Sequence, residues 1–157
     1  MKYYNYDVVF QEIPDETTLA INISNCPCHC EGCHSKFLWE DKGMELTMIE
    51  YKRLLSLYAD NITCVCFMGG DANQGWINEL AKYTAMHYPS IKVGWYTGRR
   101  EIPKPMSLRY FNYIKVGPYI KELGGLDSPN TNQRMYEIER PKLNLKDITY
   151  KFQKRNI

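Results

Sequence analysis

Four cysteines stand within the eight residues from Cys26 to Cys33, and this cluster constrains the chain more than any other feature. Cys26, Cys30 and Cys33 have the spacing C-x3-C-x2-C. A four-iron four-sulfur cluster takes four cysteine thiolates in most proteins, so three in one short loop predict a cluster whose fourth iron stays open to a small ligand. Cys28 is an alternative fourth ligand. It lies two residues from both Cys26 and Cys30, where a short loop would struggle to direct four sulfurs to separate corners, so we treat it as a non-ligand.

The length of 157 residues is that of one domain. We therefore expect a single domain over residues 1–157, with a cluster loop at 25–35 and a tail at 151–157 that frays. The 20 Lys and Arg residues nearly balance the 18 Asp and Glu residues, and no dense basic run is present. Nucleic acid is therefore not an expected partner.

The first residues mix charged side chains with tyrosines, which predicts no secretory or transit peptide and a cytoplasmic protein. The longest apolar stretch, Cys64 to Met68, is much shorter than the ~20 residues that span a bilayer, so no membrane insertion is expected. In the reducing cytosol, clustered cysteines favour metal or redox chemistry over disulfides. Cys64 and Cys66 alternate in this apolar run, which predicts packing residues on one face of a strand.

Hydrophobic periodicity predicts alternating strands and helices. Strands are expected at 8–10, 18–23, 62–68 and 91–97, with helices from Thr47 to about Asp60 and over 76–87. Residues 114–117 are a candidate fourth parallel strand, and 134–138 and 148–152 are late strands. This alternation predicts an α/β fold with a parallel sheet. A closed eight-unit barrel needs at least ~200 residues, so we expect a partial, open (β/α) barrel.

Three unusual segments each follow a predicted strand. They are the cysteine loop after Ile23, Gly69-Gly70-Asp71 after Met68, and Thr97-Gly98 after Tyr96. Ligands of α/β sheets bind at the carboxyl ends of strands, so these segments are expected to converge. Adjacent glycines let a ligand approach the backbone closely, and Asp71 adds a carboxylate suited to a cationic amine. Without the cysteines, Gly-Gly-Asp would be read equally well as a simple turn.

Together these segments resemble the radical S-adenosylmethionine (SAM) enzymes, and among them the activating enzymes of anaerobic ribonucleotide reductase. The resemblance lies in Cys26 to His34 with Gly32 before the last cysteine, Phe37 to Trp39, Met68 to Asp71, Tyr96 to Gly98, and Asn132-Gln133. The chain departs from that family where Ala72 follows Asp71 in place of proline, where Lys115-Val116-Gly117 replaces an Asp-Gly pair, and where Thr131 replaces serine.

The resemblance implies a partial barrel of radical-SAM type and two cofactors, a 4Fe-4S cluster and SAM. Cys26, Cys30 and Cys33 would hold three irons, and SAM would chelate the fourth through its amino nitrogen and carboxylate. Reductive cleavage would then give methionine and a 5′-deoxyadenosyl radical. The resemblance also implies SAM contacts, from the Asp71 carboxylate to the ammonium group and from Gly69, Gly70, Gly32, His34 and Thr97 to the rest of the molecule.

By the same resemblance, the partners are the glycyl radical loop of the anaerobic ribonucleotide reductase large subunit and a low-potential reductant such as flavodoxin or ferredoxin. Alternatives are an activase of another glycyl radical enzyme and a radical-SAM enzyme that acts on a small molecule. Two non-enzymatic alternatives are an electron-transfer protein with a fourth cysteine ligand and a structural zinc protein. Zinc is suggested by His29 and His34 beside the cysteines, but no second ligand pair follows.

Overall fold

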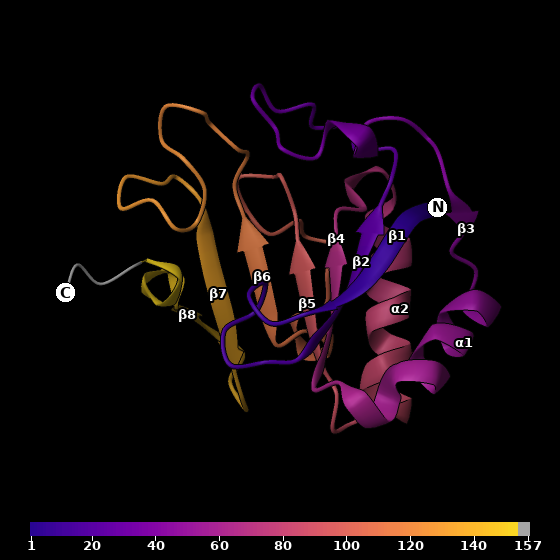
Figure 1. Cartoon of the computed structure of the whole chain (residues 1–157). Coiled ribbons are helices and arrows are strands. Elements are labelled where there is room, and N and C mark those ends of the chain that lie inside the picture. The colour runs from indigo at the N-terminus through magenta and orange to yellow at the C-terminus, as the bar shows by residue number, and fades with distance from the viewer. Residues whose placement is uncertain (154–157) are drawn as a thin grey trace.

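The computed structural model describes residues 1–153. Its strands form one sheet in the order β3-β1-β2-β4-β5-β6-β7-β8 (Figure 1). The eight strands are β1 (Lys2–Val9), β2 (Thr18–Ile23), β3 (Met44–Glu45), β4 (Cys64–Met68), β5 (Lys92–Tyr96), β6 (Tyr113–Val116), β7 (Arg134–Glu139) and β8 (Asn144–Asp147). The α-helices of residues 1–153 are α1 (Met48–Tyr58) and α2 (Gln74–His87). The same residues also form short 3₁₀ turns: η1 (Lys36–Leu38), η2 (Ala59–Asn61), η3 (Asp71–Asn73), η4 (Leu108–Tyr110) and η5 (Thr149–Phe152).

The sheet is mixed, and the predicted partial barrel of parallel βα units is wrong. Only β2, β4, β5 and β6 run parallel. β1, β3, β7 and β8 join the sheet by antiparallel pairing. The fourth parallel strand expected at 114–117 is confirmed as β6, which pairs with β5 from Gly94 opposite Tyr113 onward.

The segments that connect the strands explain why the alternation of strands and helices does not continue. The segment from β5 to β6 contains Pro103 and Pro105 and forms only the one-turn η4, because proline removes a backbone donor and clashes within a helix. β1 and β2 are joined by a short loop through Asp15, whose φ of 66° reverses the chain into a hairpin. Hairpin neighbours are antiparallel. The chain therefore builds two βα units and extends the sheet at both ends with antiparallel strands.

The two predicted helices are present and begin at side-chain caps. The Thr47 hydroxyl accepts a hydrogen bond from the Glu50 amide at 3.1 Å, and Asn73 accepts one from the Trp76 amide at 3.2 Å. Such caps satisfy amides that have no partner within the helix. Both helices cover the same face of the sheet, where Tyr51, Leu54, Leu55, Ile77 and Leu80 pack against Val65, Phe67 and Trp95.

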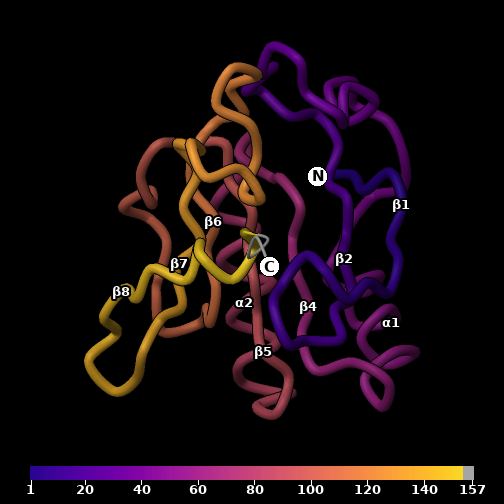
Figure 2. Tube along the Cα trace, turned by 60° about the vertical axis from the view of Figure 1, so that its left-hand side comes forward, coloured from indigo at the N-terminus to yellow at the C-terminus, as the bar shows by residue number. Residues whose placement is uncertain are grey.

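The opposite face has a second, smaller core. Cys64 and Cys66 lie fully buried there and pack with Ile13, Met135 and Ile148, as predicted for packing residues on one face. Ile13 comes from the β1–β2 loop, which crosses this face in front of the strands (Figures 1 and 2). The Tyr96 hydroxyl donates a hydrogen bond to the Glu12 carbonyl. Within residues 1–153, this packing closes the lower part of the face.

The C-terminal part differs from its prediction. Residues 148–152 were expected to form a strand, but they include η5, and the last strand is β8 instead. The Met135 amide of β7 donates its hydrogen bond to the Thr149 hydroxyl at 2.9 Å, where a neighbouring strand would offer a backbone carbonyl. Of the tail predicted to fray, residues 151 and 152 lie in η5, and residues 154–157 lie outside the described part. Among residues 1–153, no helix combines the length and apolar character needed to cross a bilayer.

Candidate metal centre

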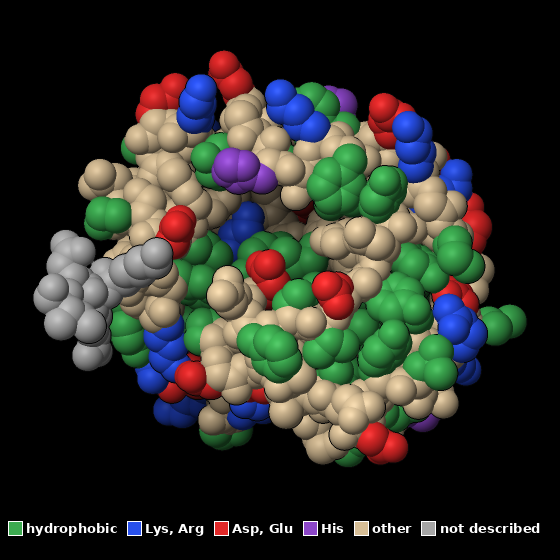
Figure 3. Space-filling view, in the orientation of Figure 1, with side chains coloured by type: hydrophobic (Ala, Val, Ile, Leu, Met, Phe, Trp, Pro, Cys, Tyr) green, Lys and Arg blue, Asp and Glu red, His purple; other side chains and the backbone are tan. Residues whose placement is uncertain are grey.

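One cavity of about 170 Å³ lies at the carboxyl ends of the four parallel strands. The arrowheads of these strands point toward the purple cysteine loop (Figure 1), and the surface of this face is hollowed in its upper half, with hydrophobic and basic side chains inside (Figure 3). All three predicted strand-end segments contribute to the wall, so their convergence is confirmed. The lining residues that matter for chemistry are Cys26, Cys28, Cys30, Cys33, Trp39, Met68, Gly69, Asp71, Tyr96, Thr97, Lys115 and Gln133.

The cysteine loop is closed at its base by two backbone hydrogen bonds. The Asn25 amide donates to the Glu40 carbonyl at 3.1 Å, and the Cys26 amide donates to the Leu38 carbonyl at 2.9 Å. The Cys33 sulfur in turn accepts from the Ser35 amide at 3.3 Å. All four loop cysteines are free and half-buried. These hydrogen bonds fix the loop, and its four cysteines line one cavity.

Asp71 is 7% exposed and connects the ends of β4 and β5. Its carboxylate accepts from the Thr97 hydroxyl and from the Gly98 amide at 2.9 Å. Two longer contacts come from the Gln74 amide group at 3.3 Å and the Cys28 thiol at 3.6 Å. Thr97 is fully buried, and its hydroxyl also accepts from the Arg99 amide at 3.1 Å. Asp71 thus organises the cavity wall even without a ligand.

Cys28 faces the interior of the site. A Cβ on Gly98 would lie 2.7 Å from the Cys28 sulfur, so glycine at position 98 makes room for this thiol. Hydrogen bonding with Cys28 lowers the pKa of the Cys26 thiol to about 6. The same bond, burial and the charge of Asp71 raise the pKa of Cys28. The Cys28 thiol thus lies between the cysteine loop and Asp71, to which it donates at 3.6 Å.

The structure adds two residues to which the sequence assigned no role. The Trp39 indole nitrogen is buried and has no hydrogen-bond partner within residues 1–153, and its ring stacks on His29 with the ring centres 4.5 Å apart. Lys115 is 8% exposed, although it lies in the strand β6, where every other residue is apolar. A single charge within such a run is the sequence signal for Lys115, because buried Lys is rare unless it is paired.

The donors present fit an iron–sulfur cluster. Thiolates are the usual ligands of such clusters, and all four loop thiols line this cavity. A buried indole N–H without a partner costs about 1–3 kcal/mol, and cluster sulfurs are acceptors that would satisfy it. Within residues 1–153, no three His, Cys, Asp or Glu side chains surround one point as the ligands of a single metal ion do. A cluster instead receives each thiolate on a different iron.

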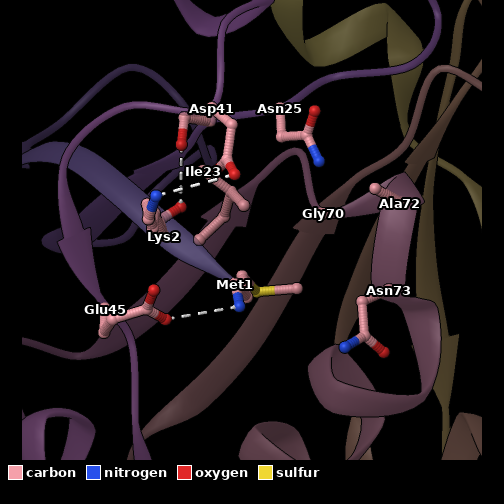
Figure 4. A pocket seen from close by; sticks show the side chains of 10 residues that line it. Met1, Lys2, Ile23, Asn25, Asp41, Glu45, Gly70, Ala72 and Asn73 are labelled. Atoms are coloured by element: carbon pink, nitrogen blue, oxygen red, sulfur yellow. Dashed lines mark hydrogen bonds and ion pairs between the residues drawn. The ribbon is translucent and has the colours of Figure 1, made fainter.

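The predicted site residues divide into two groups. Those that share the cavity are Cys26, Cys30, Cys33, Gly69, Asp71 and Thr97. Gly32 and His34 are not part of its wall, since Gly32 packs against Lys121 and His34 stacks edge-on against Tyr119 at 5.3 Å. Gly70 faces a separate polar cavity beside Met1 and Asn73 (Figure 4). The roles of all nine residues in holding SAM or the cluster stay predictions.

Comparison with known protein families agrees with this geometry. The family model for the 4Fe-4S single cluster domain matches residues 17–115, which include the cysteine loop, the strands from β2 to β5 and all of β6 except its last residue. The chain belongs to the 4Fe-4S single cluster domain family. Membership in this family means that the chain carries a 4Fe-4S cluster-binding domain, and the expected iron–sulfur cofactor is confirmed at that level. Searches of curated proteins and of solved structures found no match.

Proposed function

We propose that this protein is a radical-SAM activating enzyme that generates a glycyl radical on a partner protein, with anaerobic ribonucleotide reductase as the expected partner. The observation that carries the proposal is the cavity itself. It joins the C-x3-C-x2-C cysteines to the Gly69, Asp71 and Thr97 strand ends within one space. Three thiolates leave one iron of a 4Fe-4S cluster without a protein ligand, and that position is where SAM would bind.

Cys26, Cys30 and Cys33 would hold the cluster as thiolates, and SAM would occupy the remaining space toward Asp71. The chemistry that the two groups supply when bound is reductive cleavage of SAM into methionine and a 5′-deoxyadenosyl radical. The protein contributes position and the exclusion of water. Met68 and Tyr96 form an apolar wall for this purpose, and the β1–β2 loop closes the sheet face below them.

Asp71 would attract the SAM ammonium while holding the β5 end in place. Its two short hydrogen bonds, from Thr97 and Gly98, fix the carboxylate. The longer contacts from Gln74 and Cys28 are the ones that an ammonium donor would replace. Thr97 then acts by orienting Asp71, since its hydroxyl already donates to that carboxylate.

Gly69 would allow the ligand to approach the backbone closely. Its φ of 108° favours glycine, and an added Cβ would lie 3.2 Å from the Ile23 carbonyl. Its amide donates to the Tyr96 carbonyl at 3.1 Å, and its own carbonyl accepts from the Trp95 indole at 2.8 Å. Because both groups are already bonded, Gly69 shapes the cavity and supplies no free amide.

The test is an anaerobic assay of SAM cleavage. The protein is reconstituted with iron and sulfide, reduced with dithionite and given SAM, and 5′-deoxyadenosine and methionine are measured. Wild-type protein and Cys28→Ala should form both products, whereas Cys30→Ala should form neither. A fully loaded, reduced cluster that leaves SAM intact would contradict the proposal. Glycyl radical formation on a purified partner, followed by electron paramagnetic resonance, then tests the choice of partner.

An electron-transfer protein is the second candidate, favoured by one observation. Cys28 lines the same cavity as the three predicted ligands and is available as a fourth. In that case, Cys28→Ala would weaken cluster binding and no variant would cleave SAM. The two functions are thus separated by the same set of variants.

A further inference from the structure

Among residues 1–153, Lys115 is the one lysine in the wall of the cysteine cavity. Its ammonium donates to the Thr97 carbonyl at 3.2 Å and to the Gly117 carbonyl at 3.1 Å, and it lies 5.5 Å from the centre of the Tyr96 ring. These contacts fix the position of the charge at the strand ends. They leave a third N–H without a partner among the hydrogen bonds of residues 1–153.

Lys115 has no close counter-ion among the described residues. Asp71 lines the same cavity, but within residues 1–153 Lys115 makes no ion pair within 4 Å. Burial lowers the pKa of Lys115, and the cysteine-loop groups and Asp71 partly offset the effect. A buried ammonium with two carbonyl partners still lacks a counter-ion, and unpaired buried charge is unfavourable. Cluster-bound thiolates in the same cavity would provide the missing negative charge.

We propose that Lys115 is a positioning residue whose fixed positive charge stabilises the reduced state of the cluster and so raises its reduction potential. The proposal rests on the proposed cluster at Cys26, Cys30 and Cys33. On reduction, one electron enters from an external low-potential donor and remains on the cluster. No bond to Lys115 forms or breaks, and its ammonium keeps its protons. In a cavity of low dielectric, a nearby positive charge favours this added negative charge.

The geometry favours this role over a purely structural one. A residue needed only to join the Thr97 and Gly117 carbonyls could be neutral, because an amide N–H makes the same hydrogen bonds. An ammonium adds the cost of burying a charge. That cost is offset when a negative group enters the cavity, which predicts that the charge of Lys115 acts on the loaded site.

The test compares reduction midpoints of reconstituted variants at one pH, by redox titration followed with electron paramagnetic resonance. Lys115→Met removes the charge, Lys115→Gln removes it while retaining donors for the two carbonyls, and Lys115→Arg retains it. Lys146→Met changes an exposed lysine in β8 and serves as the matched control. Iron and sulfide content is measured first for each protein.

We expect both neutral variants to load a cluster whose reduction is at least tenfold less favourable, which lowers the midpoint potential by at least about 59 mV for one electron. The Arg variant and the β8 control should stay near wild type. A wild-type midpoint in either neutral variant would overturn the proposal. Failure of both to load iron would also overturn it, because a charge that only tunes the potential is not required for assembly. Wild-type protein that loads a cluster but leaves SAM intact would refute the proposed function alone.

Discussion

Replacing Asp71 by Asn tests whether this carboxylate organises the site before any ligand binds. The carboxylate accepts two short hydrogen bonds, from the Thr97 hydroxyl and the Gly98 amide, and it is 7% exposed. Asn is nearly the same size but has only one acceptor oxygen. One of the two donors must then face an NH₂ group. We expect the wall formed by the ends of β4 and β5 to loosen.

The magnitude follows from the bonds that are lost. A hydrogen bond to a charged group contributes about 1.5–3 kcal/mol. Asn keeps one short bond and relieves the cost of burying a charge, so we expect Asp71→Asn to lower the free energy of unfolding by about 2 kcal/mol. In a domain of this size that loss corresponds to a fall in melting temperature of roughly 4–8 °C. Asp71→Ala removes both short bonds and should cost more than Asn.

The assay is urea unfolding of the cluster-free protein, followed by tryptophan fluorescence. Asp60→Asn changes an exposed carboxylate in η2 and is the matched control, for which we expect no measurable change. An Asp71→Asn protein within about 0.5 kcal/mol of wild type, the usual range for surface substitutions, would refute the reasoning. Asp71 would then have no structural role, and its carboxylate would be free for a ligand.

Three further predictions concern other parts of the molecule. The Glu16 side chain is 6% exposed, and although burial opposes its ionisation, hydrogen bonds led by that from Lys92 lower its pKa below 4.5. Glu16→Gln should therefore lower the free energy of unfolding by about 1–3 kcal/mol at pH 7. Wild type should lose this stability as the pH falls through the lowered pKa and the variant should not, which urea unfolding at pH 7 and pH 3 measures. Trp39→Phe should retain the fold but release iron faster than wild type during chelator challenge, while Trp76→Phe, whose indole bonds to a carbonyl outside the site, should not. Gly69→Ala should destabilise the protein by about 1–3 kcal/mol in thermal unfolding, because φ is 108° at this position.

Local patterns predicted most of the elements. The helix beginning at Thr47 and the parallel strands β4 and β5 were found from capping and periodicity, which depend on neighbouring residues. The convergence of three strand-end segments was also predicted, since it follows from parallel strand direction. These features need no knowledge of distant contacts.

The overall architecture was not predicted. Whether β6 is followed by another βα unit depends on which strands pair, and pairing is a long-range property. Periodicity identifies a strand without specifying the direction of its neighbour. The hairpins at both ends of the sheet therefore appeared only in the structure, which has a mixed sheet in place of the expected partial, open barrel.

The sequence located the segments that line the cavity better than it located the residues around them. Cysteine spacing identified the loop, and Gly-Gly-Asp identified the next strand end. Lys115 and Trp39 were missed as site residues because their importance depends on burial and on absent partners, which no spacing reveals. Gly70 was expected beside Gly69, yet its φ of 97° turns the chain toward another cavity.

The most direct test of the account is the iron and sulfide content of anaerobically reconstituted cysteine variants, with electron paramagnetic resonance of the reduced proteins. Wild type and Cys28→Ala should each hold about four irons per chain, the content of one 4Fe-4S cluster. Cys26→Ala, Cys30→Ala and Cys33→Ala should hold almost none. Loss of the cluster in Cys28→Ala, or its retention in Cys30→Ala, would contradict a site built from three cysteines and one open iron.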